Sequence, residues 1–191
     1  WVDVLDAGAD GIILKTGELL ALSWDSLDNE SHRLTISQRF YKPAPGTGHN
    51  IAFLESTYNG HVRTIPVCDS CLKILHSQKR EQDIQKNSTR SIWMDTRNLI
   101  FTRPNGHHYS FTDLINYNKK LQKKTGIPYF NLKTFRNHFG VTSAASGENI
   151  KTVQDYMGYI GEVMPALFRT AGNTSSGKGC SDSINNYFNH I

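Results

Sequence analysis

The chain has 191 residues, of which 38% are hydrophobic and 20% charged, with a net charge of +4 and a pI near 8.9. This length and composition fit one globular domain that is large enough to bury a core. Apolar runs fall short of the roughly 20 residues that a membrane-spanning helix needs. Three cysteines argue against a disulfide scaffold and favour a reducing compartment, so we expect a cytoplasmic protein. The start at Trp1, without a methionine, suggests a fragment of a longer protein.

The first half of the chain predicts one short helix followed by a small sheet. Residues 17–22 carry apolar side chains at helical spacing. Residues 32–40, with Leu34 and Ile36 on one face, 50–54 and 62–67 have the pattern of strands, which predicts a three-stranded antiparallel sheet. Tyr58-Asn59-Gly60 has the composition of a hairpin turn between the last two strands.

The next predicted helix begins at Asp69 or Ser70, either of which can cap it, and runs to Lys86. Cys68 and Cys71 lie at its start, and we expect one of the two to pack inward. They form a single Cys-x-x-Cys pair, far in sequence from Cys180, and a zinc site would need a second pair at suitable spacing. We therefore expect no metal site and no cofactor.

The second half is predicted to be helical. Ser110 can cap a helix that runs to about Thr125. A helix around Arg136 ends in small residues at Gly147, and another covers 150–157 with Gly158 placed to terminate it. The fold class is α+β and mostly helical, with residues 1–171 as one domain. Residues 172–191 read as a flexible linker, rich in glycine and serine, and a C-terminal tail segment.

Charge is distributed unevenly along this second half. No aspartate or glutamate occurs from Leu114 to Gly147, a span that contains Lys119, Lys120, Lys123, Lys124, Lys133 and Arg136. A local excess of positive charge is what a phosphate-binding face needs. The alternative is an ordinary solvated helix face.

Five segments occur in the order of a known set of motifs. They are residues 17–22 followed by Trp24 and Asp28; Arg63-Thr64-Ile65-Pro66; residues 99–102 followed by Asn105-Gly106; Arg136 with Gly147; and residues 151–154 followed by Met157-Gly158. In this order the chain resembles the catalytic domain of the tyrosine recombinases, the phage-integrase family. The resemblance implies that family's fold, double-stranded DNA as partner, and DNA cleavage and rejoining through a phosphotyrosine. It also implies a bacterial or phage-encoded protein at the nucleoid.

The resemblance assigns roles to individual positions. The family's early arginine falls on Lys15, the histidine of its His-x-x-Arg pair on Lys133, and the second arginine on Arg136, which is kept. The family's histidine or tryptophan falls on Tyr159, and its hairpin lysine near Thr57. The cations among these positions, Lys15, Lys133 and Arg136, would hold the phosphate. Further phosphate contacts would come from Lys119, Lys120, Lys123 and Lys124. Arg136 could instead pair with Asp155 or Glu148.

The expected position of the nucleophilic tyrosine holds Phe168 and Arg169. Since phenylalanine has no hydroxyl, the candidate nucleophiles are Tyr159 and Tyr187, the latter in its own site or in that of a neighbouring molecule. Three hypotheses remain open: a recombinase catalytic domain, an inactive DNA-binding module or regulatory relic of a mobile element, and a structural role with protein partners only. The lysine-rich stretch argues against the third. In the family, self-association on DNA often exchanges C-terminal tails, which the linker before Ile184 would suit.

Overall fold

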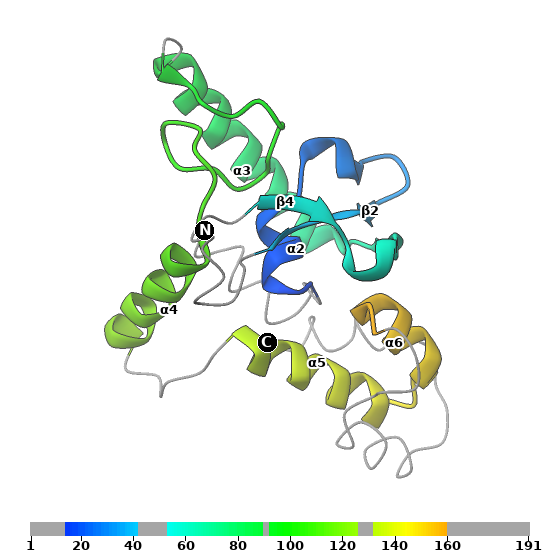
Figure 1. The fold of residues 1–191 in the computed structure, drawn as a ribbon. Coiled ribbons are helices and arrows are strands. Elements are labelled where there is room, and N and C mark those ends of the chain that lie inside the picture. Colours follow the sequence, from blue (N-terminus) through cyan, green and yellow to red (C-terminus); the bar gives the residue numbers. More distant parts are fainter. Residues whose placement is uncertain (1–13, 42–52, 90–91, 126–131, 160–191) are drawn as a thin grey trace. The chain divides into compact units, whose positions relative to one another are not determined.

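The computed structural model describes residues 14–41, 53–89, 92–125 and 132–159 (Figure 1). Their contacts divide into two compact units: the described residues from Lys15 to Thr125 form one, and Leu14 with residues 132–159 belongs to the other. The predicted tail at 172–191 lies outside the described residues. Among the described helices, none combines the length and the apolar character that crossing a membrane requires.

The first unit begins with α2 (Thr16–Leu20), which confirms the helix expected at 17–22 and ends slightly earlier. A 3-10 turn, η1 (Trp24–Ser26), follows it. Leu19, Leu20 and Leu22 are buried. The helix lies close against the strand β3 (Gln38–Tyr41), since a Cβ on Gly17 would stand 2.4 Å from the Phe40 carbonyl oxygen. Any larger residue at position 17 would force the two backbones apart.

The sheet is antiparallel, as predicted, but the strand expected at 32–40 is split. β1 (Leu27–Asp28), β2 (Arg33–Ile36) and β5 (Arg63–Pro66) form a three-stranded sheet in the order β1-β2-β5. β3 (Gln38–Tyr41) and β4 (Phe53–Ser56) form a separate two-stranded ladder (Figure 1). Leu34 and Ile36 are both buried, which confirms that they share the core face.

The hairpin turn expected at Tyr58-Asn59-Gly60 is wrong. These residues form a short 3-10 turn, η2 (Tyr58–Gly60), between two strands that pair with different partners. Ile36 pairs with Arg63 and Gln38 with Ser56, so residues 57–62 stand opposite Ser37 alone. The segment is therefore a long bulge, and Asn59 and Gly60 allow it because both adopt left-handed backbone angles, with φ of 56° and 68°.

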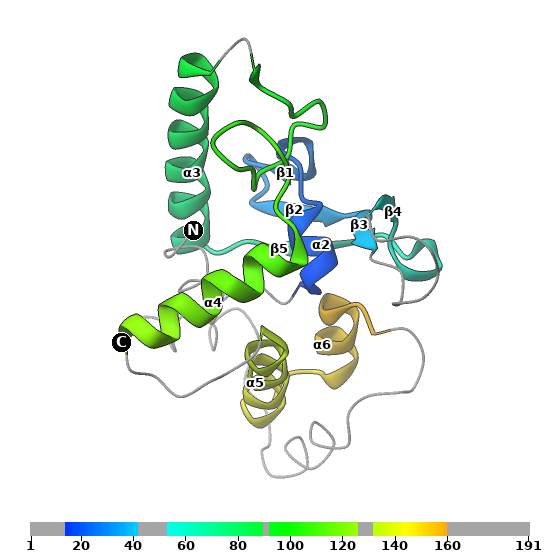
Figure 2. The same ribbon diagram turned by 60° about the vertical axis from the view of Figure 1, so that its left-hand side comes forward.

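α3 (Asp69–Ser88) is a single long helix (Figure 2). It begins one residue earlier than the expected caps allow, since its N-cap is Cys68 and no side chain caps it. Its buried Gln82 accepts a hydrogen bond from the Trp24 indole at 2.7 Å. The same amide donates to the Leu99 carbonyl and the Thr102 hydroxyl, both at 2.8 Å. Gln82 thus connects the apolar segment 99–102 to Trp24 in η1.

α4 (Phe111–Thr125) follows a reciprocal cap, as the sequence predicted. The Asp113 amide donates to the Ser110 hydroxyl at 3.1 Å, and the Ser110 amide donates to the Asp113 carboxylate at 2.8 Å. Arg103 pairs with the same carboxylate at 2.5 Å. The single acid in the first turn of α4 is therefore engaged at the N-terminal end of the helix.

In the second unit, α5 (Leu132–Ala145) packs on α6 (Ile150–Met157). The Asn149 side chain accepts the Lys151 and Thr152 amides and starts α6. Gly158 ends it in the left-handed conformation, with φ of 65°, as predicted. Ala144, Val153 and Met157 are buried and form the described core of this unit.

Candidate functional site

Arg136, the one family cation that this sequence keeps in type, is buried on α5. Its guanidinium donates a hydrogen bond to the Met157 carbonyl and lies over the Tyr159 ring, 4.9 Å from the ring centre. Met157 is the last residue of α6, where carbonyls lack helical partners and the helix dipole favours a cation. The structure therefore brings Arg136 and Tyr159 together at the end of α6.

The two acids considered as partners of Arg136 have different surroundings. Asp155 has the Lys151 ammonium as a partner at 2.8 Å, one turn away on the exposed face of α6. Glu148 is buried, and its Oε1 has no hydrogen-bond partner among the described residues. The contacts that hold Arg136 include those with the end of α6 and with the Tyr159 ring.

Lys133 lies three residues before Arg136 on α5 and is exposed to solvent. Residues at this spacing lie on the same face of a helix. Tyr159 is half-buried. Arg136 and Tyr159 therefore lie together in the second unit, with Lys133 about one turn earlier on α5. Tyr187 and Phe168 lie outside the described residues.

Lys15 belongs to the first unit, where it is the half-buried N-cap of α2. Its amide donates to the Glu18 carboxylate at 2.9 Å. The Arg63 guanidinium donates two hydrogen bonds to the same carboxylate, of 3.0 and 2.7 Å. These contacts fix the backbone of Lys15 and tie it to β5.

The Glu18–Arg63 pair was not predicted. The two side chains are only 2% and 6% exposed, so the pair is desolvated. Burial alone would raise the pKa of Glu18, but the hydrogen bonds and charge of Arg63, together with Lys15, lower it. A glutamate followed directly by two leucines is the signal that could have been used, because a buried charge needs a partner. The partner itself, 45 residues away, is not visible in the sequence.

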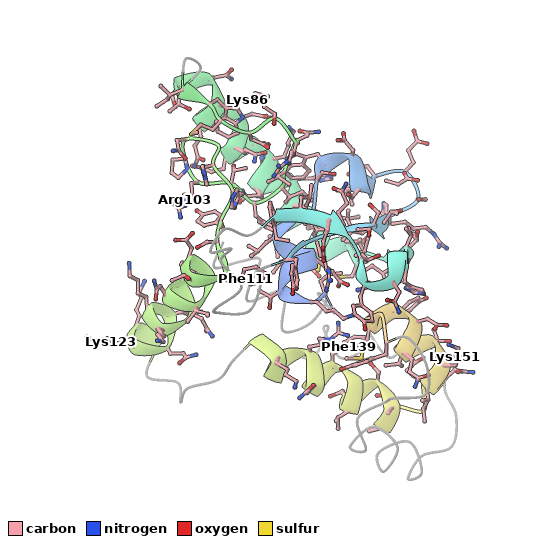
Figure 3. The ribbon with its side chains drawn as sticks, viewed as in Figure 1. Lys86, Arg103, Phe111, Lys123, Phe139 and Lys151 are labelled. Atoms are coloured by element: carbon pink, nitrogen blue, oxygen red, sulfur yellow. The ribbon has the colours of Figure 1, made fainter. Side chains whose placement is uncertain are left out.

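Two further sets of predicted positions are described in the first unit. Thr57, the position of the family's hairpin lysine, is buried and donates its hydroxyl to the His61 carbonyl at 2.5 Å. Lys119, Lys120, Lys123 and Lys124 are all exposed on α4, and Figure 3 labels Lys123 near the C-terminal end of that helix. In the described ranges no group of three or more histidine, cysteine or acidic residues could hold a metal ion.

Comparison with known proteins supports the resemblance to this family. The chain is 26% identical over 160 residues to a XerC-like tyrosine recombinase of Caldanaerobacter subterraneus subsp. tengcongensis, in an alignment that covers 79% of this chain and 40% of that protein. The chain is therefore similar to the tyrosine recombinases. The resemblance drawn from the five motifs is therefore confirmed. No family model matches the chain.

Solved structures agree on the fold. The integrase of transposon Tn1549, in complex with a circular-intermediate DNA, has a TM-score of 0.65 at 19% identity over 100% of this chain and 57% of that chain. The same integrase with transposon right-end DNA gives 0.67 at 18% identity over 99% and 58%. The XerA recombinase gives 0.58 at 14% identity over 98% and 56%. The α+β, mostly helical recombinase fold is confirmed, and this chain spans about half the length of these recombinases.

Proposed function

We propose that this recombinase domain binds double-stranded DNA through its phosphates and presents Arg136 to one of them. The observation that carries the proposal is the exposure of all four α4 lysines in a span that has no acidic residue from 114 to 147. Cations in such a row release counterions from DNA when they bind. The acid nearest in sequence, Asp113, is engaged by Arg103 and Ser110. The structures of the related Tn1549 integrase in complex with DNA support the same partner.

Arg136 would bind the phosphate at which the family's chemistry takes place. A guanidinium can hold two oxygens of one phosphate with a planar fork. The hydrogen bond to the Met157 carbonyl holds the Arg136 side chain in place before DNA binds. Binding would therefore cost less side-chain conformational entropy. Lys133, on the same face of α5, would add a point charge without a fork. Lys15, whose backbone is held by Glu18 in the first unit, stays a predicted phosphate contact.

The proposed domain binds DNA without cleaving it, because the family's tyrosine position falls on Phe168. Cleavage remains a second candidate function because of one observation, the Tyr159 ring lying over the Arg136 guanidinium. A hydroxyl near a phosphate-binding arginine is the arrangement that covalent catalysis needs. Tail exchange through residues 184–191, and location at the nucleoid of a bacterial cell, also stay predictions.

Binding to DNA can be tested with a pair of α4 lysines. We expect Lys119→Gln with Lys123→Gln to lower the slope of log affinity against log salt by roughly 0.9 for each phosphate that the variant no longer neutralises. Fluorescence anisotropy with a labelled duplex at several salt concentrations measures the slope. The matched control is Lys73→Gln with Lys86→Gln, two exposed lysines on α3. Equal slopes for the α4 variant and the unmodified domain would contradict the proposal.

Cleavage can be tested separately with a nicked suicide substrate, which traps a covalent protein–DNA adduct. We expect no adduct on denaturing gels, whereas duplex binding persists. An adduct that disappears in Tyr159→Phe would establish the second candidate function with Tyr159 as nucleophile. An adduct that disappears only in Tyr187→Phe would assign the reaction to the C-terminal segment.

A further inference from the structure

Two cysteines stand at the N-terminal end of α3, and neither is among the residues assigned to DNA. Cys68 is the N-cap of this 20-residue helix, and Cys71 stands three positions later in its first turn. Residues at this spacing lie on the same side of a helix. Cys68 is half-exposed, whereas Cys71 is buried with Leu72 and Leu75 beneath the helix. One thiol is therefore open to reagents and the other is shielded.

The surroundings of Cys68 stabilise a thiolate. The Ser70 hydroxyl lies 3.1 Å from its sulfur. A hydrogen bond from the Cys71 thiol, which is the largest contribution, and those of Ser70 and the backbone amides at the helix start lower the pKa of Cys68 to about 5, against the effect of burial. The positive end of the helix dipole acts in the same direction.

A metal does not account for this pair in the part of the chain that the structure describes. A structural zinc ion takes four ligands, and no third histidine, cysteine or acidic residue completes a group with these two among the described residues. What characterises the two thiols is their spacing of three residues at the start of one helix and their unequal access to solvent. This is the arrangement of an attacking and a resolving thiol.

We propose that Cys68 and Cys71 form a reactive dithiol that exchanges with small disulfides such as oxidised glutathione. The Cys68 thiolate attacks one sulfur of the glutathione disulfide, so that a mixed disulfide forms and one glutathione thiolate leaves. The Cys71 sulfur then attacks Cys68, loses its proton to the second departing glutathione, and closes the Cys68–Cys71 disulfide. Two protein thiols are oxidised, and one glutathione disulfide is reduced to two thiols.

The full chain, reduced and then exposed to oxidised glutathione, tests the pairing. Alkylation before and after reduction, followed by peptide mass spectrometry, locates each disulfide without altering Cys180. We expect a Cys68–Cys71 disulfide that dithiothreitol reverses. In Cys71→Ser, we expect glutathione to remain attached to Cys68, because no resolving thiol is present. A pair that stays reduced, or an adduct that persists on Cys68 in the unmodified chain, would overturn the proposal.

The rate of Cys68 alkylation against pH gives a second measurement that needs no substitution. We expect the rate to reach half of its plateau near pH 5, whereas an ordinary cysteine does so near its pKa of about 8.5. In Cys71→Ala the midpoint should move upward, since alanine cannot donate the largest stabilising hydrogen bond. A midpoint in the ordinary range for the unmodified chain would contradict the assignment of Cys68 as the attacking thiol.

Discussion

Replacing Arg63 with methionine is expected to lower the free energy of unfolding by about 3–5 kcal/mol, because it leaves the buried Glu18 carboxylate without its cationic partner. Urea unfolding measures this change. The matched control is Asp83→Asn, which breaks the Lys79–Asp83 pair on the surface of α3, where the side chains are 42% and 50% exposed. That substitution should cost less than about 1 kcal/mol.

A second substitution separates the effect of removing the ion pair from the effect of the stranded charge. Adding Glu18→Gln to Arg63→Met removes the buried charge and keeps an oxygen that can accept the Lys15 amide. We expect the double variant to be more stable than Arg63→Met alone. If the double variant were less stable by the full sum of both single changes, the two side chains would not be coupled, and their pairing would contribute nothing to this fold.

The same pair sets the response of stability to acid. In the folded chain the pKa of Glu18 is below its unfolded value of 4.5, so its stabilising contribution is present above that value and is lost as pH falls through the folded pKa. In Arg63→Met, burial dominates and raises the pKa, so acid should stabilise that variant relative to the unmodified domain. Unfolding curves at about pH 6 and about pH 4 report the reversal of sign.

Replacing Arg136 with alanine is expected to weaken DNA binding by roughly ten- to a hundredfold, the equivalent of one charge-assisted hydrogen bond of about 1.5–3 kcal/mol. Arg136→Lys should recover part of this affinity, since it keeps the charge but not the fork. Lys151→Ala is the matched control, because Lys151 is an exposed cation on α6 whose side chain is 71% accessible. Titrations with one duplex at one salt concentration compare the three variants.

Arg136→Ala also removes the hydrogen bond to the Met157 carbonyl, so stability must be measured alongside affinity. We expect a cost of about 1 kcal/mol from that hydrogen bond, which leaves the variant folded at the binding temperature. A folded Arg136→Ala variant with unchanged affinity would remove this arginine from the DNA-contacting residues. If the variant lost affinity only under conditions in which it unfolds, the role of Arg136 would be confined to holding α6.

Most of the helix limits could be predicted because their signals are local. Asn149 caps α6 through amides two and three residues later, and Gly158 ends the same helix with its own backbone angle. Ser110 and Asp113 likewise fix the start of α4 through each other. The N-cap of α3, Cys68, was not predicted because its side chain makes no capping hydrogen bond.

The strand pairing depended on contacts that no local pattern encodes. Tyr58-Asn59-Gly60 has the residues of a hairpin turn, yet β4 pairs with β3 and β5 with β2, so the segment becomes a bulge opposite Ser37. Backbone angles that suit a turn also suit a bulge, and only the partners of the flanking strands distinguish the two. Gln82 and Trp24, 58 residues apart, are a further pairing of this kind.

By itself the sequence determined the likeness to the tyrosine recombinases, the helices around Arg136, and the acid-free stretch that favours a phosphate partner, because each depends on consecutive residues or on motif order. Only the tertiary structure decided what holds the site residues. It placed Arg136 against the Met157 carbonyl and the Tyr159 ring, and it buried Glu18 with Arg63 behind Lys15. These contacts join residues far apart in the chain, and their strength comes from burial, which folding creates.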